Sequence, residues 1–241
     1  MLVKTRGIVF RSVKYSETSL ICDIYTEELG LRTYIVSGVR AKKPKVSASL
    51  LQVMTLLDLV VYHRDNKDLN RTKEIKPALL YQSIPFDVLK SAVGLFMIEL
   101  ARKTIKESEP GPALFRFLFD CFTYLDTMEE GVANFHLYFA VHLTRFLGFM
   151  PGNDYIIGHS WFDLEAGVFK TRKPIHGYHL DEPMSELLHQ LLTLSLEEIG
   201  DIPLNRKMRN DFIEKWLAYY SYHVENMTQI QAHTVLKEIL G

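Results

Sequence analysis

The sequence is poor in cysteine, with only Cys22 and Cys121 among its 241 residues. Each lies among apolar neighbours, and the two are too far apart for a Cys-x-x-Cys metal site or a disulfide framework, so we expect two reduced, buried thiols. The chain also lacks any run of about 20 apolar residues that would span a bilayer. Its first residues, MLVKTRGIVF, contain no apolar signal-peptide core. These absences predict a cytoplasmic protein with no membrane partner.

Common catalytic signatures are missing as well. The sequence contains no Gly-x-x-x-x-Gly-Lys phosphate-binding loop, no Gly-x-Gly-x-x-Gly, no Gly-x-Ser-x-Gly and no His-Glu-x-x-His. Its paired carboxylates, such as Glu129-Glu130, fall at expected turns or helix ends, where a solvated surface is the ordinary role. We therefore expect neither an enzyme nor a cofactor.

A net charge of -1 hides two unlike parts of the chain. Residues 1–80 carry 14 Lys and Arg against 8 Asp and Glu, a net charge of +6, whereas residues 81–241 carry 14 against 21, a net charge of -7. A cationic portion of this kind points to a polyanionic partner. Solubility, or docking on the acidic remainder, explains the charge split equally well.

Short runs rich in β-branched and aromatic residues alternate with turns over residues 3–36, and two more such runs at 56–62 and 72–78 flank a polar segment. This alternation is typical of antiparallel strands joined by hairpins. A helix-like insertion at 46–52 separates the third run from the fourth. The pattern predicts a five-stranded OB-fold barrel, a nucleic-acid-binding domain, over residues 1–80.

After Pro85 the apolar residues recur at spacings of three and four, which is typical of amphipathic helices. We expect the first helix to begin at Pro85 with Phe86 on its apolar face, and a second to begin at Pro112. Residues 81–241 thus predict a mostly α-helical domain, which makes the whole chain an α+β multidomain protein. An irregular insert with one hairpin is expected at 150–182, because that segment is dense in Gly and Pro and has no helical period. Further helices are expected around Phe135 and at 183–196, 207–222 and 232–240.

The insert contains four side chains that could ligate a metal. Their spacing matches no tight structural site and the insert has no thiolate, so we expect no metal and keep metal binding as the weaker alternative. The four are His159, Asp163, His176 and His179.

Cations are spread over the expected strands and loops of the barrel, together with Tyr15, Tyr25 and Tyr34. Cations beside exposed rings can hold a phosphate backbone while bases stack on the rings. Strand edges also use Lys to prevent aggregation, and for Arg64, Lys67 and Lys73 the two explanations weigh equally. Four cations around one proline in the loop GVRAKKPK favour function. The residues expected to bind nucleic acid are Arg6, Arg11, Lys14, Arg32, Arg40, Lys42, Lys43, Lys45, Arg71 and Lys73.

One run begins with GIVFRSVKYSETSLICDIYTEELG and continues through Gly38-Val39-Arg40 and its lysines to Leu50-Leu51-Gln52. The order of these motifs resembles the RecO family of bacterial recombination mediators. The phrase Leu147-Gly148-Phe149-Met150-Pro151, and Glu109-Pro110 ahead of a Leu/Phe-rich helix, resemble the family's helical domain. The resemblance covers nearly the whole chain and is strongest over residues 1–80.

The resemblance implies an OB-fold followed by a helical domain, and a function in DNA repair. Members of the family bind single- and double-stranded DNA and anneal complementary strands. Together with RecR they help the RecA recombinase load on strands coated by single-strand-binding protein, and they dock on the C-terminal tail of that protein. A bacterial, nucleoid-associated location follows from the same resemblance.

One departure concerns the insert, where many members carry a four-cysteine zinc module. Residues 150–182 contain no cysteine, so we transfer no metal ligand. In place of the zinc we expect a small apolar core formed by Trp161, Phe162, Val168 and Phe169.

No sharp motif marks the pocket that would receive the tail of single-strand-binding protein. Arg102, Lys103 and Arg116 are candidates only because an acidic tail needs a cation beside an apolar pocket. Two alternatives remain for the chain as a whole. One is an RNA-binding OB-fold protein, and the other is a protein-interaction adaptor that does not bind nucleic acid directly.

Overall fold

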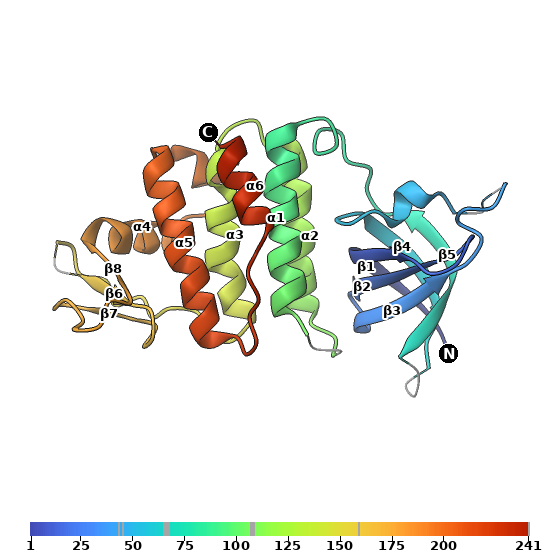
Figure 1. The fold of residues 1–241 in the computed structure, drawn as a ribbon, viewed down its shortest axis with the longest axis horizontal. Coiled ribbons are helices and arrows are strands. Elements are labelled where there is room, and N and C mark those ends of the chain that lie inside the picture. The colour runs from blue at the N-terminus through green and yellow to red at the C-terminus, as the bar shows by residue number, and fades with distance from the viewer. Residues whose placement is uncertain (43, 45, 65–67, 107–108, 159, 241) are drawn as a thin grey trace. The chain divides into compact units, whose positions relative to one another are not determined.

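The computed structural model describes residues 1–42, 44, 46–64, 68–106, 109–158 and 160–240. The chain divides into two compact units (Figure 1). We call them the barrel unit, Met1–Pro85 with Ile105–Asp126, and the helical unit, Phe86–Thr104 with Thr127–Gly241. The barrel unit therefore draws one helix from well beyond its last strand.

The barrel unit contains a closed five-stranded barrel in the order β1-β2-β3-β5-β4 (Figure 1). Neighbouring strands pair antiparallel, except β3 and β5, whose short parallel pairing completes the closure. A 3₁₀ turn, η1 (Ala48–Leu51), lies in the predicted insertion between β3 and β4. The five-stranded OB-fold barrel predicted from the sequence is confirmed. Its strands are β1 (Leu2–Lys14), β2 (Leu20–Thr26), β3 (Gly30–Val36), β4 (Leu56–Tyr62) and β5 (Leu69–Pro77).

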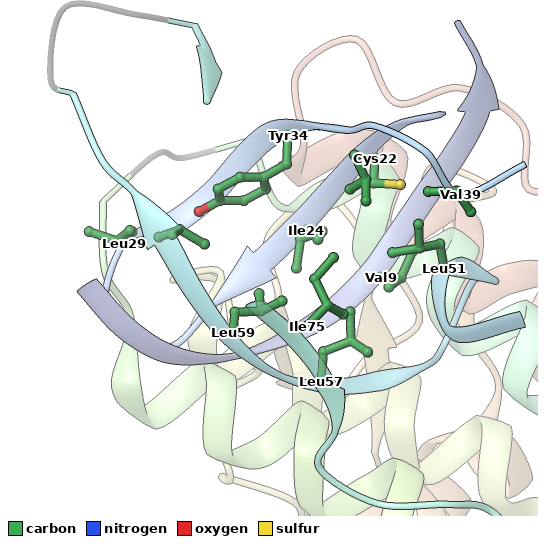
Figure 2. Packing of buried hydrophobic residues seen from close by; sticks show 12 residues of the cluster. Val9, Cys22, Ile24, Leu29, Tyr34, Val39, Leu51, Leu57, Leu59 and Ile75 are labelled. Atoms are coloured by element: carbon green, nitrogen blue, oxygen red, sulfur yellow. The ribbon is translucent and has the colours of Figure 1, made fainter. Parts of the chain in front are cut away.

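Alternate residues of the strands point into the barrel and fill it with mostly aliphatic side chains (Figure 2). Cys22, Ile24 and Tyr34 are fully buried in this cluster, so the expectation of a buried Cys22 is confirmed. Glycine is required at position 7, on the inner side of β1, because a Cβ there would lie 2.6 Å from the side chain of Ile24 and 2.8 Å from that of Leu59. The described residues of the barrel interior thus form a packed core.

One helix, α2 (Pro112–Thr127), covers part of the outer side of β1 and β2 within the barrel unit. Phe10 stacks on Tyr25 with ring centroids 5.5 Å apart, and Tyr25 lies 6.3 Å from the ring of Phe115 on α2. A β-bulge after Val9 shifts the register of β1 against β2, so that the neighbouring Arg11 also pairs on the outer side, opposite Asp23. The outer wall is therefore buried under α2 at Phe10 and exposed at Arg11.

The helical unit contains α1 (Val88–Thr104), and here one expectation was wrong. The helix begins at Val88 rather than Pro85, because the Asp87 carboxylate accepts the Lys90 amide at 2.9 Å and caps the first turn. Phe86 lies before the helix and is 84% exposed, so it does not belong to the apolar face. The predicted start of α2 at Pro112 is confirmed. The remaining helices are α3 (Val132–Phe146), α4 (Glu182–Thr193), α5 (Arg206–His223) and α6 (Ala232–Ile239), and α1 packs on α3 and α6.

The insert folds into a small sheet in the order β7-β6-β8, formed by β6 (Trp161–Asp163), β7 (Val168–Lys170) and β8 (His179–Leu180). The predicted hairpin is β6 with β7, whereas β8 was not predicted. Phe162 and Phe169 are buried, and the ring of Phe162 lies 6.0 Å from that of Trp216 on α5. Val168 is 36% exposed, so it does not join the expected core. Trp216 of α5 completes this apolar core in place of Val168.

Among the described residues, no helix has the length and hydropathy that a membrane-spanning segment needs.

Candidate nucleic-acid interface

Two loops meet at one end of the barrel and bring cations together there. The amide of Arg40, in the loop after β3, donates to the carbonyl of Thr18 in the β1–β2 turn at 3.3 Å. Gly38 turns the chain toward this contact with φ +75°, a conformation that favours glycine. Arg40 and Lys42 of the one loop are exposed, and so are Lys14, the last residue of β1, and Tyr15 in the β1–β2 turn, whose ring is 60% exposed.

Of the four cations in that loop, Lys43 and Lys45 lie outside the described residues. The interface is therefore built on Arg40 and Lys42, and a role for Lys43 and Lys45 stays a prediction.

On the outer side of the sheet, near this end, two rows of side chains run across neighbouring strands. In the first row, Arg11 of β1 pairs with Asp23 of β2, Asp23 with Thr33 of β3, and Thr33 with Leu69 of β5. The Arg11 guanidinium lies 3.6 Å from the Asp23 carboxylate but keeps 54% of its side chain exposed. Thr33 donates its hydroxyl to the other oxygen of Asp23 at 2.8 Å. Asp23 is therefore held in place, and Arg11 retains donors for a further anion.

The second row is aliphatic and ends in an arginine and a ring. The three aliphatic residues of β1, β2 and β3 are half-buried, while Arg71 is exposed and Tyr62 is 47% exposed. In order across the strands the row is Val13, Ile21, Ile35, Arg71 and Tyr62.

We call these exposed residues the cationic face, defined as Arg11, Lys14, Tyr15, Arg40, Lys42 and Arg71 together with the half-buried aliphatic row beside them. Lys73 is also exposed, and it lies in the β-bulge of β5, between the residues that pair with Val60 and Val61. Its role in binding stays a prediction.

Arg6 is engaged elsewhere. Its Nε and Nη2 atoms donate to the two carboxylate oxygens of Glu27 at 2.9 and 2.8 Å, and its guanidinium lies 4.7 Å from the ring centroid of Phe119 and 5.4 Å from that of Phe115. The bidentate hydrogen bond lowers the pKa of Glu27 and raises the pKa of Arg6. Arg6 thus links β1 to α2 and does not belong to the cationic face.

Arg32 does not lie on the cationic face either. It is half-buried, and its Nη1 donates to the carbonyl of Leu31 at 3.1 Å. It pairs across the strands with the interior residue Ile24, on the same side of β3 as Tyr34. Burial raises the pKa of Tyr34 to about 12, an effect that the nearby Arg32 charge partly offsets.

Two of the three tyrosines expected to stack on bases cannot do so. Tyr25 is 2% exposed beneath α2, and Tyr34 is fully buried inside the barrel. The reason is that strand alternation predicts on which side of the sheet a side chain lies, but not whether another element covers that side. Tyr62 was missed, although the alternation of LLDLVVY places it on the outer side with Asp58 and Val60.

In the insert, Asp163 is already paired. Its buried carboxylate accepts from Lys170 Nζ at 2.6 Å, from His176 Nε2 at 3.2 Å, and from the amides of Glu165 and Ala166. Burial alone would raise the pKa of Asp163, but these donors lower it to about 2. His159 lies outside the described residues. In the part of the chain that the structure describes, no three His, Cys, Asp or Glu side chains gather as a metal site would require.

The candidates for docking the tail of single-strand-binding protein lie on α1 and on α2. Lys103 forms an ion pair with Glu99 at 2.7 Å, whereas Arg102 and Arg116 are exposed on α1 and α2. Their role stays a prediction.

A closed five-stranded barrel with exposed cations and an aliphatic row on its outer side, followed by a helical unit, defines a protein of the OB-fold class. Two family models match the chain, Recombination protein O N terminal over residues 1–81 and Recombination protein O C terminal over residues 85–229. The chain belongs to the RecO family of DNA repair proteins.

Relatives named DNA repair protein RecO align with the whole chain. The protein of Christiangramia forsetii is 35% identical over 242 residues, covering 100% of both chains. That of Bacteroides fragilis is 34% identical over 240 residues, covering 99% of both chains. A third, from Flavobacterium psychrophilum, is 32% identical over 243 residues and again covers 100% of both chains. The family predicted from the order of sequence motifs is confirmed.

Proposed function

We propose that the cationic face binds single-stranded DNA and that the protein anneals complementary strands. Together with RecR, it would help RecA load on strands coated by single-strand-binding protein, whose C-terminal tail would dock on the helical unit. Membership of the RecO family supports this proposal. The observation that carries it is the Arg40–Thr18 contact, because it joins the cationic loop to the β1–β2 turn, which follows Lys14 and contains Tyr15.

The geometry suits a single strand in two ways. Arg11, Lys14, Arg40, Lys42 and Arg71 are exposed and offer charges to successive phosphates. The half-buried aliphatic row beside them offers an apolar floor for sugars and bases, and it crosses strands 2 and 3, whose face binds oligonucleotides in OB-folds.

Annealing follows from charge neutralisation. Two complementary strands repel each other through their phosphates, and a protein that neutralises part of that charge lowers the cost of bringing the bases together. In this proposal no covalent bond is made or broken, and the protein acts as a mediator. Double-stranded DNA would be held by the same phosphate contacts.

The test compares wild type with the double variant Arg40→Ala/Lys42→Ala by fluorescence anisotropy of a labelled single strand of about 30 nucleotides across a salt series. Binding should weaken steeply as salt rises, and loss of two phosphate contacts should reduce the slope of log affinity against log salt by up to about 1.4. The matched control is Lys4→Ala/Lys76→Ala. It removes the same charge from exposed positions of the barrel unit outside the cationic face.

Equal losses in the two double variants would mean that binding depends on net charge alone and would remove the role of the loop. Tighter binding of an RNA strand of equal length would favour the RNA-binding alternative. If wild type binds no nucleic acid even at low salt, the adaptor alternative replaces the proposal.

A further inference from the structure

A pocket opens on the outer side of the barrel where β4 ends and β5 begins. It has a volume of about 540 Å³ and is lined by Tyr62, Arg64, Leu69, Asn70 and Arg71. Its size falls within the range of roughly 300–1,000 Å³ that is usual for sites that enclose a small molecule. Among the cations of the cationic face, Arg71 is the one that lines it.

The lining combines one ring with two cations. Tyr62 is 47% exposed and Leu69 is 39% exposed, so the pocket has apolar surface that solvent reaches. Arg64 and Arg71 are exposed, and within the described ranges neither guanidinium forms an ion pair. The described residues of the lining include no carboxylate. An anionic ligand with a flat apolar portion fits this combination.

Part of the lining is fixed by the fold. The buried Asn70 accepts the amide of Arg64 through its side-chain oxygen at 3.3 Å, which ties the end of β4 to the start of β5. Tyr62 and Arg71 are register partners on these two strands. The ring and the arginine are therefore held side by side by backbone pairing.

The pocket is continuous with the cationic face. Arg71 pairs with Tyr62 on one side and with Ile35 of the aliphatic row on the other. Leu69 pairs with Thr33, the residue that steadies Asp23 beside Arg11. A DNA strand lying along the two rows would therefore reach the pocket without leaving the surface of the barrel.

We propose that this pocket receives one unpaired base of the DNA strand bound on the cationic face. The base stacks on the ring of Tyr62, and the guanidinium groups of Arg64 and Arg71 hold the phosphates on either side of it. In a duplex the bases are paired and stacked on one another, so entry of a base requires unstacking it, whereas a single strand offers its bases freely. The inference rests on the proposed function and adds to it that Tyr62 makes the protein prefer single-stranded over double-stranded DNA.

The experiment measures the affinity of the full-length protein for a labelled dT30 strand and for a labelled 30-base-pair duplex at one fixed salt concentration. Tyr62→Ala should bind dT30 about 5-fold to 150-fold more weakly, the usual range for loss of one aromatic stacking partner, and should bind the duplex like wild type. Tyr62→Phe keeps the ring and should bind both ligands like wild type. Tyr178→Ala is the matched control, because it removes a tyrosine of similar exposure, 52%, from the helical unit.

Tyr62→Leu keeps the result interpretable if the alanine variant folds poorly, because it retains apolar bulk without a ring and should lose dT30 affinity like Tyr62→Ala. An alanine variant that binds dT30 like wild type would overturn the inference. So would an equal loss for dT30 and duplex, which would make Tyr62 a contact to the backbone. If wild type binds neither ligand, the proposed function itself fails, and that result differs from every outcome in which only the Tyr62 variants change.

Discussion

At the scale of single residues, the buried carboxylate of Asp163 ties three segments of the insert together. It belongs to β6, its cationic partner Lys170 to β7, and His176 to the loop before β8. A structural metal plays the same part in many small folds, by joining loops that have little apolar core. In this insert, the Asp163 carboxylate with its four donors joins the segments.

Replacing Asp163 by Asn should lower the free energy of unfolding by about 2 kcal/mol at pH 7, because Lys170 and His176 lose a charged acceptor in a buried place. The folded pKa of about 2 lies below the ordinary value of 3.8, so the stabilisation is complete above that value and is lost as the pH falls from about 4 to 2. Urea unfolding followed by tryptophan fluorescence measures this. Both tryptophans, Trp161 and Trp216, lie in the helical unit.

The control for this prediction is Glu165→Gln, which removes a carboxylate from the same turn but leaves 47% of that side chain's surface in solvent from the start. It should change the free energy of unfolding by less than about 0.5 kcal/mol. If the difference in free energy of unfolding between wild type and Asp163→Asn does not decrease in acid, the charge of Asp163 is not what stabilises the insert.

At the scale of elements, the segment that follows β5 is held by the end of α2. The Asp126 carboxylate accepts the amides of Gln82, Ser83 and Ile84 at 2.7, 2.8 and 2.9 Å. Burial would raise the pKa of Asp126, and these backbone donors lower it instead. The three amides are donors with no place in a helix or strand, and one side chain satisfies them together.

Asp126→Ala should therefore destabilise this junction by about 2 to 3 kcal/mol, since three amides lose their acceptor, and Asp126→Asn should lose less because it keeps one oxygen. Hydrogen exchange followed by mass spectrometry should show faster exchange in the peptide that covers residues 82–84. The exposed Glu129→Gln, three positions further along the chain, should leave that exchange unchanged. Unchanged exchange in Asp126→Ala would mean that the loop is ordered by other contacts.

The elements also show what the sequence could predict. Hydrophobic alternation located β4 at 56–62, and Pro112 marked the start of α2, because both signals are local. Asp87 displaced the expected start of α1 through a capping bond that competes with the proline signal. Tyr25 is buried by Phe115, 90 positions away in the chain, and no local pattern reports such a contact.

The candidate site divides in the same way. Cations could be counted from the sequence, and their enrichment in the first third pointed to a polyanion. The sequence could not show which of these cations are free to bind an anion, because the partners of Arg6 lie in the β2–β3 turn and on α2. The meeting of the two loops at Arg40 and Thr18 likewise depends on the pairing of β2 with β3, which sets Leu20 opposite Val36.

At the scale of the whole molecule, the boundary between the two family matches does not coincide with the boundary between compact units. The N-terminal match ends at residue 81 and the C-terminal match begins at residue 85, yet residues 105–126 belong to the barrel unit. The reason is α2, whose Phe115 and Phe119 rings lie against Tyr25 and Arg6 of the barrel. The stability of the barrel should thus depend on a segment that the C-terminal match contains.

Phe115→Ala tests this dependence in the full-length chain. Phe115 is fully buried, and removing a buried phenylalanine costs about 3 to 5 kcal/mol. Hydrogen exchange should accelerate in peptides from β1 and β2, which carry Phe10 and Tyr25, and should stay unchanged in β6 and β7 of the helical unit. The control is Arg116→Ala at the next, exposed position. Acceleration confined to the helical unit, or equal acceleration throughout the chain, would mean that α2 does not stabilise the barrel specifically.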